Sequence, residues 1–147
     1  MAEAKSQSRK QDPWPSFNFR VEIDGVPFTG FCRVDGLEST IDVSEHDGAP
    51  AKGKPKRPRR RQVGSIVVQR AASAYRHLWD WHQAAVEGRD DRRAGKVSVL
   101  GEDGKVVMTI GFEGAWPCRW KLTTLDALRS GVLIEEIELA VEDLWVE

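Results

Sequence analysis

One stretch of this sequence, Ser73 to Gly88, has the spacing of apolar residues that predicts an α-helix, and it constrains everything around it. Ser73 can accept a hydrogen bond from a free backbone N–H, and Gly88 can adopt the left-handed conformation that ends a helix. The predicted apolar face consists of Tyr75, Leu78, Trp79, His82, Ala85 and Val86. Trp81 lies off that face. Such a helix needs an apolar surface, which the flanking strands must supply.

Most of the remaining sequence alternates apolar and polar residues over short stretches, as β-strands with one buried face do. The stretches with this pattern are 16–23, 26–34, 37–45, 63–70, 96–100, 105–112 and 132–142. Asp24-Gly25 and the run 101–104 carry turn residues that favour hairpins. The segment 114–121 is aromatic, and Pro117 is expected to break it.

These patterns predict a mainly β fold: an antiparallel β-barrel or sandwich of about seven or eight strands with one flanking α-helix at about 73–88. A chain of 147 residues has the size of a single domain. Residues 1–13 are polar, end in Asp12-Pro13, and are expected to form a flexible arm. The domain is expected to cover 14–147.

Composition excludes several classes of protein. The net charge of −1 gives no global attraction to nucleic acid or anionic membranes, and no apolar run is long enough to span a bilayer. The N-terminus lacks the apolar core of a secretory signal, so we expect the chain to be cytoplasmic when made. Under those conditions Cys32 and Cys118 are expected to be reduced thiols.

No catalytic motif is present. The sequence contains no GxSxG, GxxxxGK[ST], GxGxxG, HExxH or CxxC pattern. His77 and His82 are five residues apart, so a straight helix does not place them on one face. Glu135 and Glu136 are adjacent on a predicted strand and point to opposite faces. We therefore expect no enzyme activity, no metal site, no cofactor and no small-molecule substrate.

A basic loop is predicted at 47–62, where three prolines, two glycines and seven cations follow Asp47. The cations are Lys52, Lys54, Lys56, Arg57, Arg59, Arg60 and Arg61. Three interpretations remain open: phosphate binding in a nucleic-acid-binding barrel, a solvated loop, or contact with an acidic partner. Residues 132–147 hold six acids and no base, so Glu136, Glu138 and Glu142 of another copy could be that partner.

Three tryptophans are further candidates for subunit contact. Trp14 and Trp145 lie near the chain ends, where they either fold back on the domain or meet a neighbouring molecule. Trp81 lies off the predicted apolar face of the helix and could meet the next subunit.

Several short motifs, taken together and in order, resemble the tail tube proteins of T-even-like contractile phages and the inner tube proteins of extracellular contractile injection systems. The matching segments are Phe17–Gly25, Gly30-Phe31, Val34–Glu38, Leu78–His82, Asp91–Arg93, Phe112–Trp120 and Glu135–Ala140. The resemblance covers 12–145. It departs from the family at 54–61, where the loop is short, rich in proline and basic.

The resemblance implies a β-barrel with a flanking helix, which forms hexameric rings stacked into a hollow tube inside a contractile sheath. It implies sheath, baseplate or hub, and terminator proteins as partners, cargo in the lumen, and delivery through a target membrane without stable insertion of the subunit. Assembly in the cytoplasm as part of a phage tail-like particle or virion, with release outside, is implied as well. The unusual loop keeps a tube-initiator ring between spike hub and tube as an alternative.

Overall fold

The computed structural model describes residues 12–27, 30–45 and 56–147 of the chain. Its elements are β1 (Phe19–Ile23), β2 (Phe31–Asp35), β3 (Ser39–Glu45), β4 (Lys56–Val63), β5 (Ile66–Ala71), α2 (His77–Val86), β6 (Arg93–Leu100), β7 (Val106–Leu122), β8 (Ile134–Ala140) and β9 (Asp143–Val146). The predicted mainly β fold with one flanking helix is therefore confirmed. Of the predicted flexible arm at 1–13, residues 1–11 lie outside the described residues.

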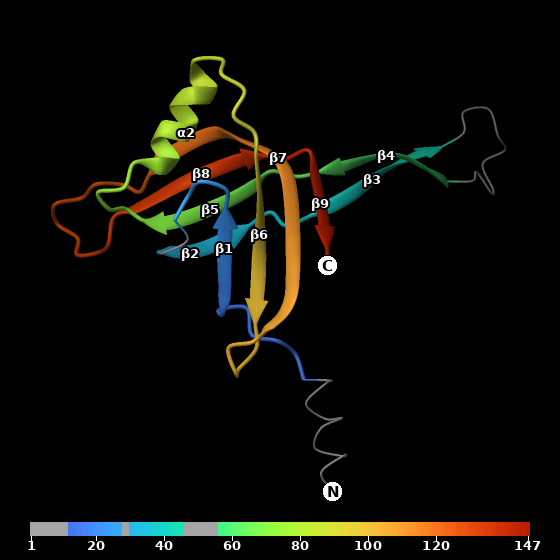
Figure 1. Ribbon diagram of the computed structural model, residues 1–147, viewed down its shortest axis with the longest axis horizontal. Helices are drawn as coiled ribbons and strands as arrows, with labels where there is room; N and C mark the ends of the chain where they lie inside the picture. Colours follow the sequence, from blue (N-terminus) through green and yellow to red (C-terminus); the bar gives the residue numbers. More distant parts are fainter. Residues whose placement is uncertain (1–11, 28–29, 46–55) are drawn as a thin grey trace, which may run out of the picture.

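Seven strands form one antiparallel sheet in the order β1-β6-β7-β8-β5-β2, with β9 added beside β7. The 17-residue strand β7 belongs to two layers, because its first half pairs with β6 and β9 and its second half pairs with β8. In Figure 1, β8, β5 and β2 run across the direction of β1, β6 and β9. The core lies between these two parts of the sheet.

Alternation along the strands fills this core as the sequence predicts. Val21 and Ile23 on β1, Ile66 and Val68 on β5, and Ile137 and Leu139 on β8 are all buried. Phe112 and Ala115 add the contribution of β7. Helix α2 covers one side of the core with Leu78, Trp81 and Ala84. The strand period of two thus decides which residues become core.

The break expected at Pro117 does not occur, because β7 continues through it. A bulge lies between Pro117 and Arg119, where the pairing with β8 shifts register. A bulge is a position where a strand tolerates a proline, since the ladder is already interrupted there. Gly114, with a φ of 66°, lies just before this point. Pro117 therefore marks a bulge within β7 and not the end of the strand.

The Asp24-Gly25 turn forms, but the hairpin expected beyond it does not. Gly25 has a φ of 72°, and the Val26 amide donates to the Ile23 carbonyl at 3.0 Å. β1 then pairs with β6, and β2 pairs with β5, so the two strands are not partners. In the described residues, one isolated bridge joins Ile23 and Val26 across the turn. Pro27 follows it and has no backbone N–H with which to extend a ladder.

The prediction of a loop at 47–62 is wrong for residues 56–62, which belong to a strand. Residues 56–63 form β4, which pairs with β3 in a separate two-stranded sheet, while 46–55 lie outside the described residues. A hairpin with solvent on both faces can carry cations on either side, so its charge run does not exclude a strand. The second predicted hairpin, between β6 and β7, is confirmed, and Gly104 has a φ of 78° there.

The helix is shorter than predicted and presents a different face to the core. It begins at His77, and the Ser73 hydroxyl accepts a hydrogen bond only from the amide of Tyr75. Gly88 has a φ of 78° and ends the helix as expected. Because Tyr75 and Val86 lie at or beyond its ends and are exposed, they do not extend an apolar stripe. The buried stripe runs through Trp81 instead of Trp79.

Candidate assembly surfaces

The hairpin formed by β3 and β4, here called the β3–β4 arm, projects from the body of the molecule (Figure 1). Its register places Ile41 opposite Arg61 and Thr40 opposite Gln62, so the arm has two different faces. One face is polar, where Gln62 donates to Asp42 at 2.8 Å. The other presents Ile41 and Val43, whose exposed fractions are 56% and 61%. Two exposed β-branched residues on one projecting face are suited to covering by another molecule.

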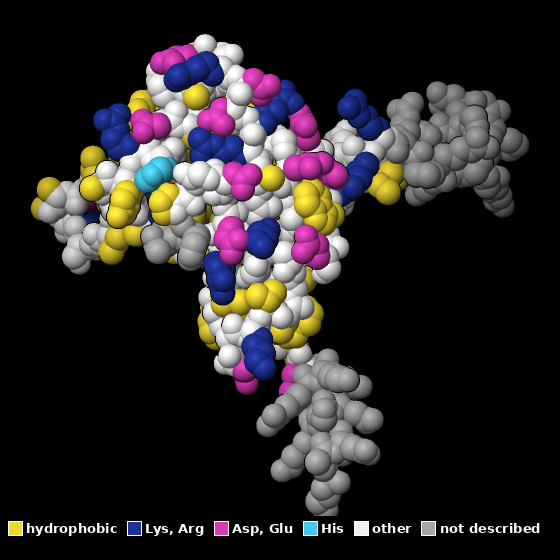
Figure 2. Space-filling view, viewed as in Figure 1, with side chains coloured by type: hydrophobic (Ala, Val, Ile, Leu, Met, Phe, Trp, Pro, Cys, Tyr) yellow, Lys and Arg dark blue, Asp and Glu magenta, His cyan; other side chains and the backbone are white. Residues whose placement is uncertain are grey.

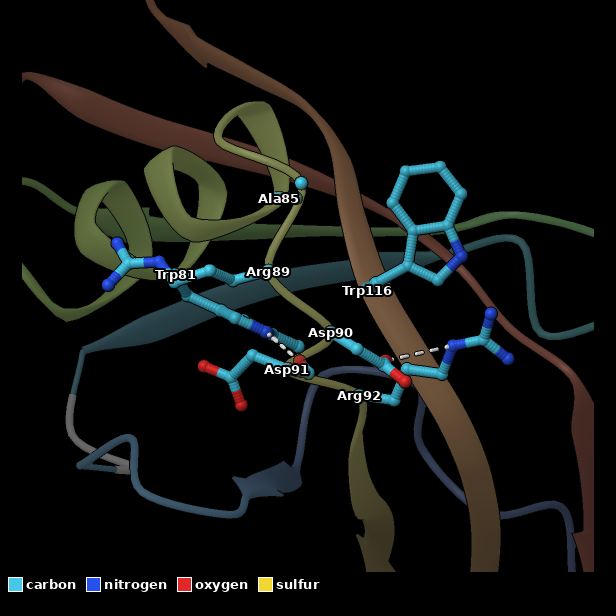
Figure 3. Close-up of a pocket in the computed structure, with 8 residues that line it drawn as sticks. Trp81, Ala85, Arg89, Asp90, Asp91, Arg92 and Trp116 are labelled. Atoms are coloured by element: carbon cyan, nitrogen blue, oxygen red, sulfur yellow. Dashed lines mark hydrogen bonds and ion pairs between the residues drawn. The ribbon is translucent and has the colours of Figure 1, made fainter.

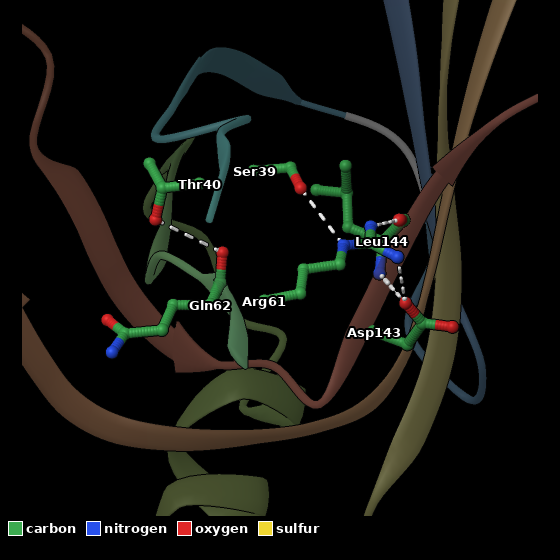
Figure 4. Close-up of polar contacts among 6 residues, drawn as sticks. All are labelled: Ser39, Thr40, Arg61, Gln62, Asp143 and Leu144. Atoms are coloured by element: carbon green, nitrogen blue, oxygen red, sulfur yellow. Dashed lines mark hydrogen bonds and ion pairs between the residues drawn. The ribbon is translucent and has the colours of Figure 1, made fainter. Parts of the chain in front are cut away.

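The base of the β3–β4 arm is tied to the C-terminal strand by Arg61 (Figure 4). Its Nε donates to the Ser39 hydroxyl at 3.0 Å, and a second nitrogen lies 3.1 Å from the Asp143 carboxylate. The third nitrogen donates to the Leu144 carbonyl. Arg61 therefore already has partners within its own chain.

The remaining predicted cations are placed less completely. Lys52 and Lys54 lie outside the described residues, and Lys56, Arg57 and Arg59 fall in β4 with side chains that are not described. Arg60 is exposed and, with Arg61 and Glu142, lines a hollow of about 660 Å³ at the base of the arm. The hollow brings basic and acidic candidates together within one subunit.

The predicted acids and tryptophans are scattered over the body. Glu142 pairs with Arg92, whereas Glu136 accepts a hydrogen bond from Gln69 at 2.8 Å and Glu138 from Cys118. Trp14 is 53% exposed, and Trp145 packs over Gly111, where an added Cβ would lie 2.5 Å from the indole. Trp81 is 1% exposed, so the expectation that it lies at the surface is wrong.

The outer side of the sheet formed by β7, β8, β5 and β2 is mostly polar, with Val67 of β5 lying between Asp35 and Glu138. Cross-strand register places Lys121 opposite Glu136 and Arg119 opposite Glu138 on β7 and β8. Gln69 on β5 lies between Glu136 and Arg33, which continues the same face onto β2. The charged side chains of this face, three of each sign, are Arg33, Arg119, Lys121, Asp35, Glu136 and Glu138. We call this surface the polar face.

An apolar region lies at the end of the molecule that carries the β7–β8 loop, residues 123–133. Leu125 and Leu128 of this loop are 77% and 96% exposed. Apolar side chains gather at this end in the space-filling view (Figure 2, left). Next to the loop, Tyr75, Trp79 and Trp120 line a groove of about 390 Å³. The region is larger than scattered single apolar residues and is typical of an interaction surface.

A buried ion pair lies below this groove, and the sequence analysis missed it. Arg70 and Glu135 are 2% and 5% exposed, and their charged atoms are 3.5 Å apart. The other carboxylate oxygen accepts a hydrogen bond from the Trp120 indole at 2.8 Å. The sequence did carry one signal for this pair: in the strand alternation, Arg70 falls on the same face as the core residues Ile66 and Val68. Glu135 likewise alternates with Ile137 and Leu139.

The pocket beside the C-terminal end of α2 is lined by charged side chains that form ion pairs with neighbouring residues, such as Arg92 with Asp90 (Figure 3). Its volume is about 330 Å³, and Trp81 donates from its indole to the Asp91 carbonyl at 2.7 Å. Arg93 donates to both carboxylate oxygens of Asp91, at 3.1 and 2.9 Å, and so holds the pKa of Asp91 below its ordinary value. The arrangement stabilises the turn after the helix.

The described residues offer neither a metal site nor a membrane-spanning helix. No group of three or more His, Cys, Asp or Glu side chains that could hold a metal ion occurs in residues 12–27, 30–45 and 56–147. Within the same ranges, no helix has the length and apolar character needed to cross a membrane. Cys32 and Cys118 are unpaired thiols, as expected.

Comparisons with known proteins point in one direction. The family described as T4-like virus tail tube protein gp19 matches residues 15–145. A chain of the anti-feeding prophage baseplate is similar at 25% identity, with 93% of this chain and 97% of that chain covered and a TM-score of 0.82. A chain of the sheath–tube complex of an extracellular contractile injection system, PVC, is 22% identical, with coverages of 97% and 96% and a TM-score of 0.85.

A chain of the anti-feeding prophage cap, which terminates the tube, is similar at 20% identity, with coverages of 93% and 92% and a TM-score of 0.82. Among curated protein sequences, none matches the chain significantly. These three solved structures with a similar fold come from baseplate, sheath–tube and cap assemblies.

Proposed function

Because the chain belongs to the T4-like virus tail tube protein family, we propose that it is the main inner-tube subunit of a contractile injection system or phage tail. The family consists of structural tube proteins and not of enzymes. In the proposed assembly, hexameric rings of this subunit stack around a lumen. A sheath surrounds the tube, a baseplate or hub and a terminator close its ends, and the particle delivers cargo through a target membrane.

The observation that carries this proposal is the polar face, defined above. One side of the sheet β7-β8-β5-β2 is buried on the core, while the other presents equal numbers of cations and carboxylates. A lumen must stay hydrated and must not hold a passing polypeptide, which balanced charges favour over a large field of one sign. We therefore place the polar face toward the lumen, and with it Glu136 and Glu138.

The ends of the sheet suit a closed ring. The path from β1 to β2 contains six strands with antiparallel neighbours, so its two end strands run in opposite directions. β2 of one copy placed beside β1 of the next continues the alternation without turning either copy over. The backbone of Asn18 and Asp24 hydrogen-bonds to the β6 side, so the N–H and C=O groups of the even-numbered β1 residues face β6. The N–H and C=O groups of Phe19 and Val21 therefore face the free edge of the sheet.

The β3–β4 arm is the proposed contact with a neighbouring copy. Ile41 and Val43 supply an apolar face, and the cations at 52, 54, 56, 57, 59 and 60 supply positive charge that acids of the next copy would neutralise. Glu142, at the base of the arm, is the proposed acidic counterpart, and the exposed Trp14 is a further contact. Trp145 packs on Gly111 of its own chain, so in the proposed assembly it stabilises β9 and is not itself a subunit contact.

Electron microscopy of the purified protein tests the proposal. We expect rings or tubes, on their own or after addition of the hub protein, since a tube subunit can require nucleation. The variant Ile41→Asp/Val43→Asp is expected to abolish assembly and leave the circular dichroism of the body unchanged. A strict monomer at high concentration, with and without the hub, would exclude the main-tube role.

A second role within the same assembly is motivated by the likeness to a baseplate chain. As a tube-initiator ring, the protein would form single rings that bind the hub and do not stack on one another. The two roles are separated by adding purified hub in substoichiometric amounts. Tubes longer than one ring support the main-tube role, and rings that stop at one layer support the initiator.

A further inference from the structure

The β3–β4 arm lacks most of the contacts that keep the other strands in place. In the described part of the chain, β3 and β4 make their substantial backbone contacts only with each other. A two-stranded hairpin is marginally stable in water without further packing. Among the described side chains of the arm, Val63, at the end of β4, packs against the core. Something else must therefore fix the direction in which the arm points.

Arg61 has the geometry for this task. All three nitrogens of its guanidinium are used: one on Ser39 of β3, one on Asp143 and one on Leu144 of β9. The side chain begins on β4, so a single planar group links both strands of the arm to a third strand (Figure 4). The directions of these donors are fixed within one plane, which a lysine ammonium cannot reproduce.

The strand that receives Arg61 is itself held firmly. β9 pairs with β7 over residues 110–113, and the Trp145 ring lies directly on Gly111. The Glu147 amide extends this ladder by donating to the Thr109 carbonyl at 2.9 Å. A connection therefore runs from the arm through Arg61 and β9 to the central strand of the fold.

We infer that Arg61 is a positioning residue that fixes the β3–β4 arm against β9, and not one of the cations that meets a neighbouring subunit. Its guanidinium is committed to partners in its own chain, whereas Arg60, the next residue, is exposed beside the hollow at the base of the arm. The consequence for assembly rests on the proposed function, because it requires that the arm be an assembly contact.

Hydrogen exchange followed by mass spectrometry tests the anchor without any assembly. Arg61→Gln is expected to accelerate exchange of residues 39–43 roughly tenfold while leaving the β8 segment 134–140 unchanged. Arg61→Lys keeps the charge but not the planar fork, so it is expected to behave like Arg61→Gln. The matched control is Arg60→Gln, which removes the same charge from the same strand and should leave the exchange of 39–43 as in the wild type.

Rescue by charge reversal separates an anchoring contact from a general loss of stability. Arg61→Asp combined with Asp143→Arg restores the ion pair between β4 and β9, and it should recover part of the protection that Arg61→Asp loses. Unchanged exchange in Arg61→Gln, or equal acceleration in Arg60→Gln, would overturn the inference.

Assembly gives the second measurement. Both Arg61→Gln and Arg61→Lys are expected to raise the concentration needed for tube formation. Normal assembly of Arg61→Lys alone would show that charge is sufficient, and would return Arg61 to the subunit contact. If the wild type forms no assembly while Arg61→Gln still accelerates exchange in the arm, the anchor stands and the tube proposal fails.

Discussion

At the scale of single residues, the Arg70–Glu135 pair is the least expected feature of the core. Both side chains are almost completely buried, and the Trp120 indole donates to the same carboxylate. Arg70 also lies over the Phe31 ring at 5.6 Å, so its charge is partly compensated by the aromatic face. Removing one partner of such a pair leaves the other charge buried without compensation.

Arg70→Met is expected to destabilise the domain by about 3–5 kcal/mol, because it leaves the Glu135 carboxylate buried and unpaired. The double variant Arg70→Met/Glu135→Gln should regain much of this loss, since glutamine still offers an oxygen to the Trp120 indole. Urea unfolding of the two single variants and the double variant measures the coupling. Strictly additive free energies would show that the pair is not coupled.

The pKa of Asp91 is lowered in the folded protein, because Arg93 donates hydrogen bonds to its carboxylate. Because the folded-state pKa lies below the unfolded value, the carboxylate adds stability above the unfolded pKa, and this stability is lost as pH falls through the folded pKa. Asp91→Asn should therefore lower the urea midpoint at pH 7, and the difference from the wild type should narrow in acid. A difference that stays constant between pH 7 and pH 3 would exclude this linkage.

At the scale of elements, helix α2 shows how a small error in a boundary changes an interpretation. The sequence period is consistent with two stripes, and the start at His77 selects the one through Leu78, Trp81 and Ala84. Trp81 is then fixed between the Asp91 carbonyl and the Arg93 guanidinium, which lies 4.8 Å above its ring. Trp79 instead packs edge-on against Trp120, with ring centroids 4.9 Å apart.

Trp81→Ala is therefore expected to cost about 3–5 kcal/mol of unfolding free energy, as large core truncations do. Trp79→Ala should cost about 1–2 kcal/mol, because it loses the ring contacts with Trp120 and His82 from a side chain that is only partly buried. Thermal and urea unfolding of both variants measures the difference. A larger loss in Trp79→Ala would restore the original assignment of the faces.

The strand pattern itself was predictable from sequence, because alternation is local and β5 and β8 follow it residue by residue. Which strands pair with one another was harder to predict from the sequence. Nothing near Asp24-Gly25 indicates that β1 will leave its sequence neighbour and pair with β6, since that choice depends on the core as a whole. The strand character of 56–62 was hidden by charge, and the Arg61 contacts depend on β9, which is 83 residues away at Leu144.

At the scale of the whole molecule, the polar face gives a test of orientation in the assembled tube. Cys118 lies on this face, with its Sγ 3.5 Å from a carboxylate oxygen of Glu138. Partial burial and this neighbour raise the pKa of the Cys118 thiol, so the fraction of reactive thiolate is below that of an ordinary cysteine and increases with pH.

In a Cys32→Ser background, a small maleimide is expected to label Cys118 in monomers and in assembled tubes alike. A maleimide carrying a bulky polymer should label monomers readily and tubes much more slowly, because it must enter from the ends of the lumen. Mass spectrometry of the labelled protein gives both rates. Equal labelling of monomers and tubes by the bulky reagent would place the polar face on the outside.

The length of β7 has a mechanical consequence. In the proposed assembly, a tube pushed through a membrane would carry a compressive load, and each subunit would have to pass that load on without deforming. Because one covalently continuous strand of 17 residues belongs to both layers, neither layer can slide past the other unless ladders with β6, β8 and β9 are sheared together. Resistance to shear in this subunit is therefore a collective property of three ladders along one backbone.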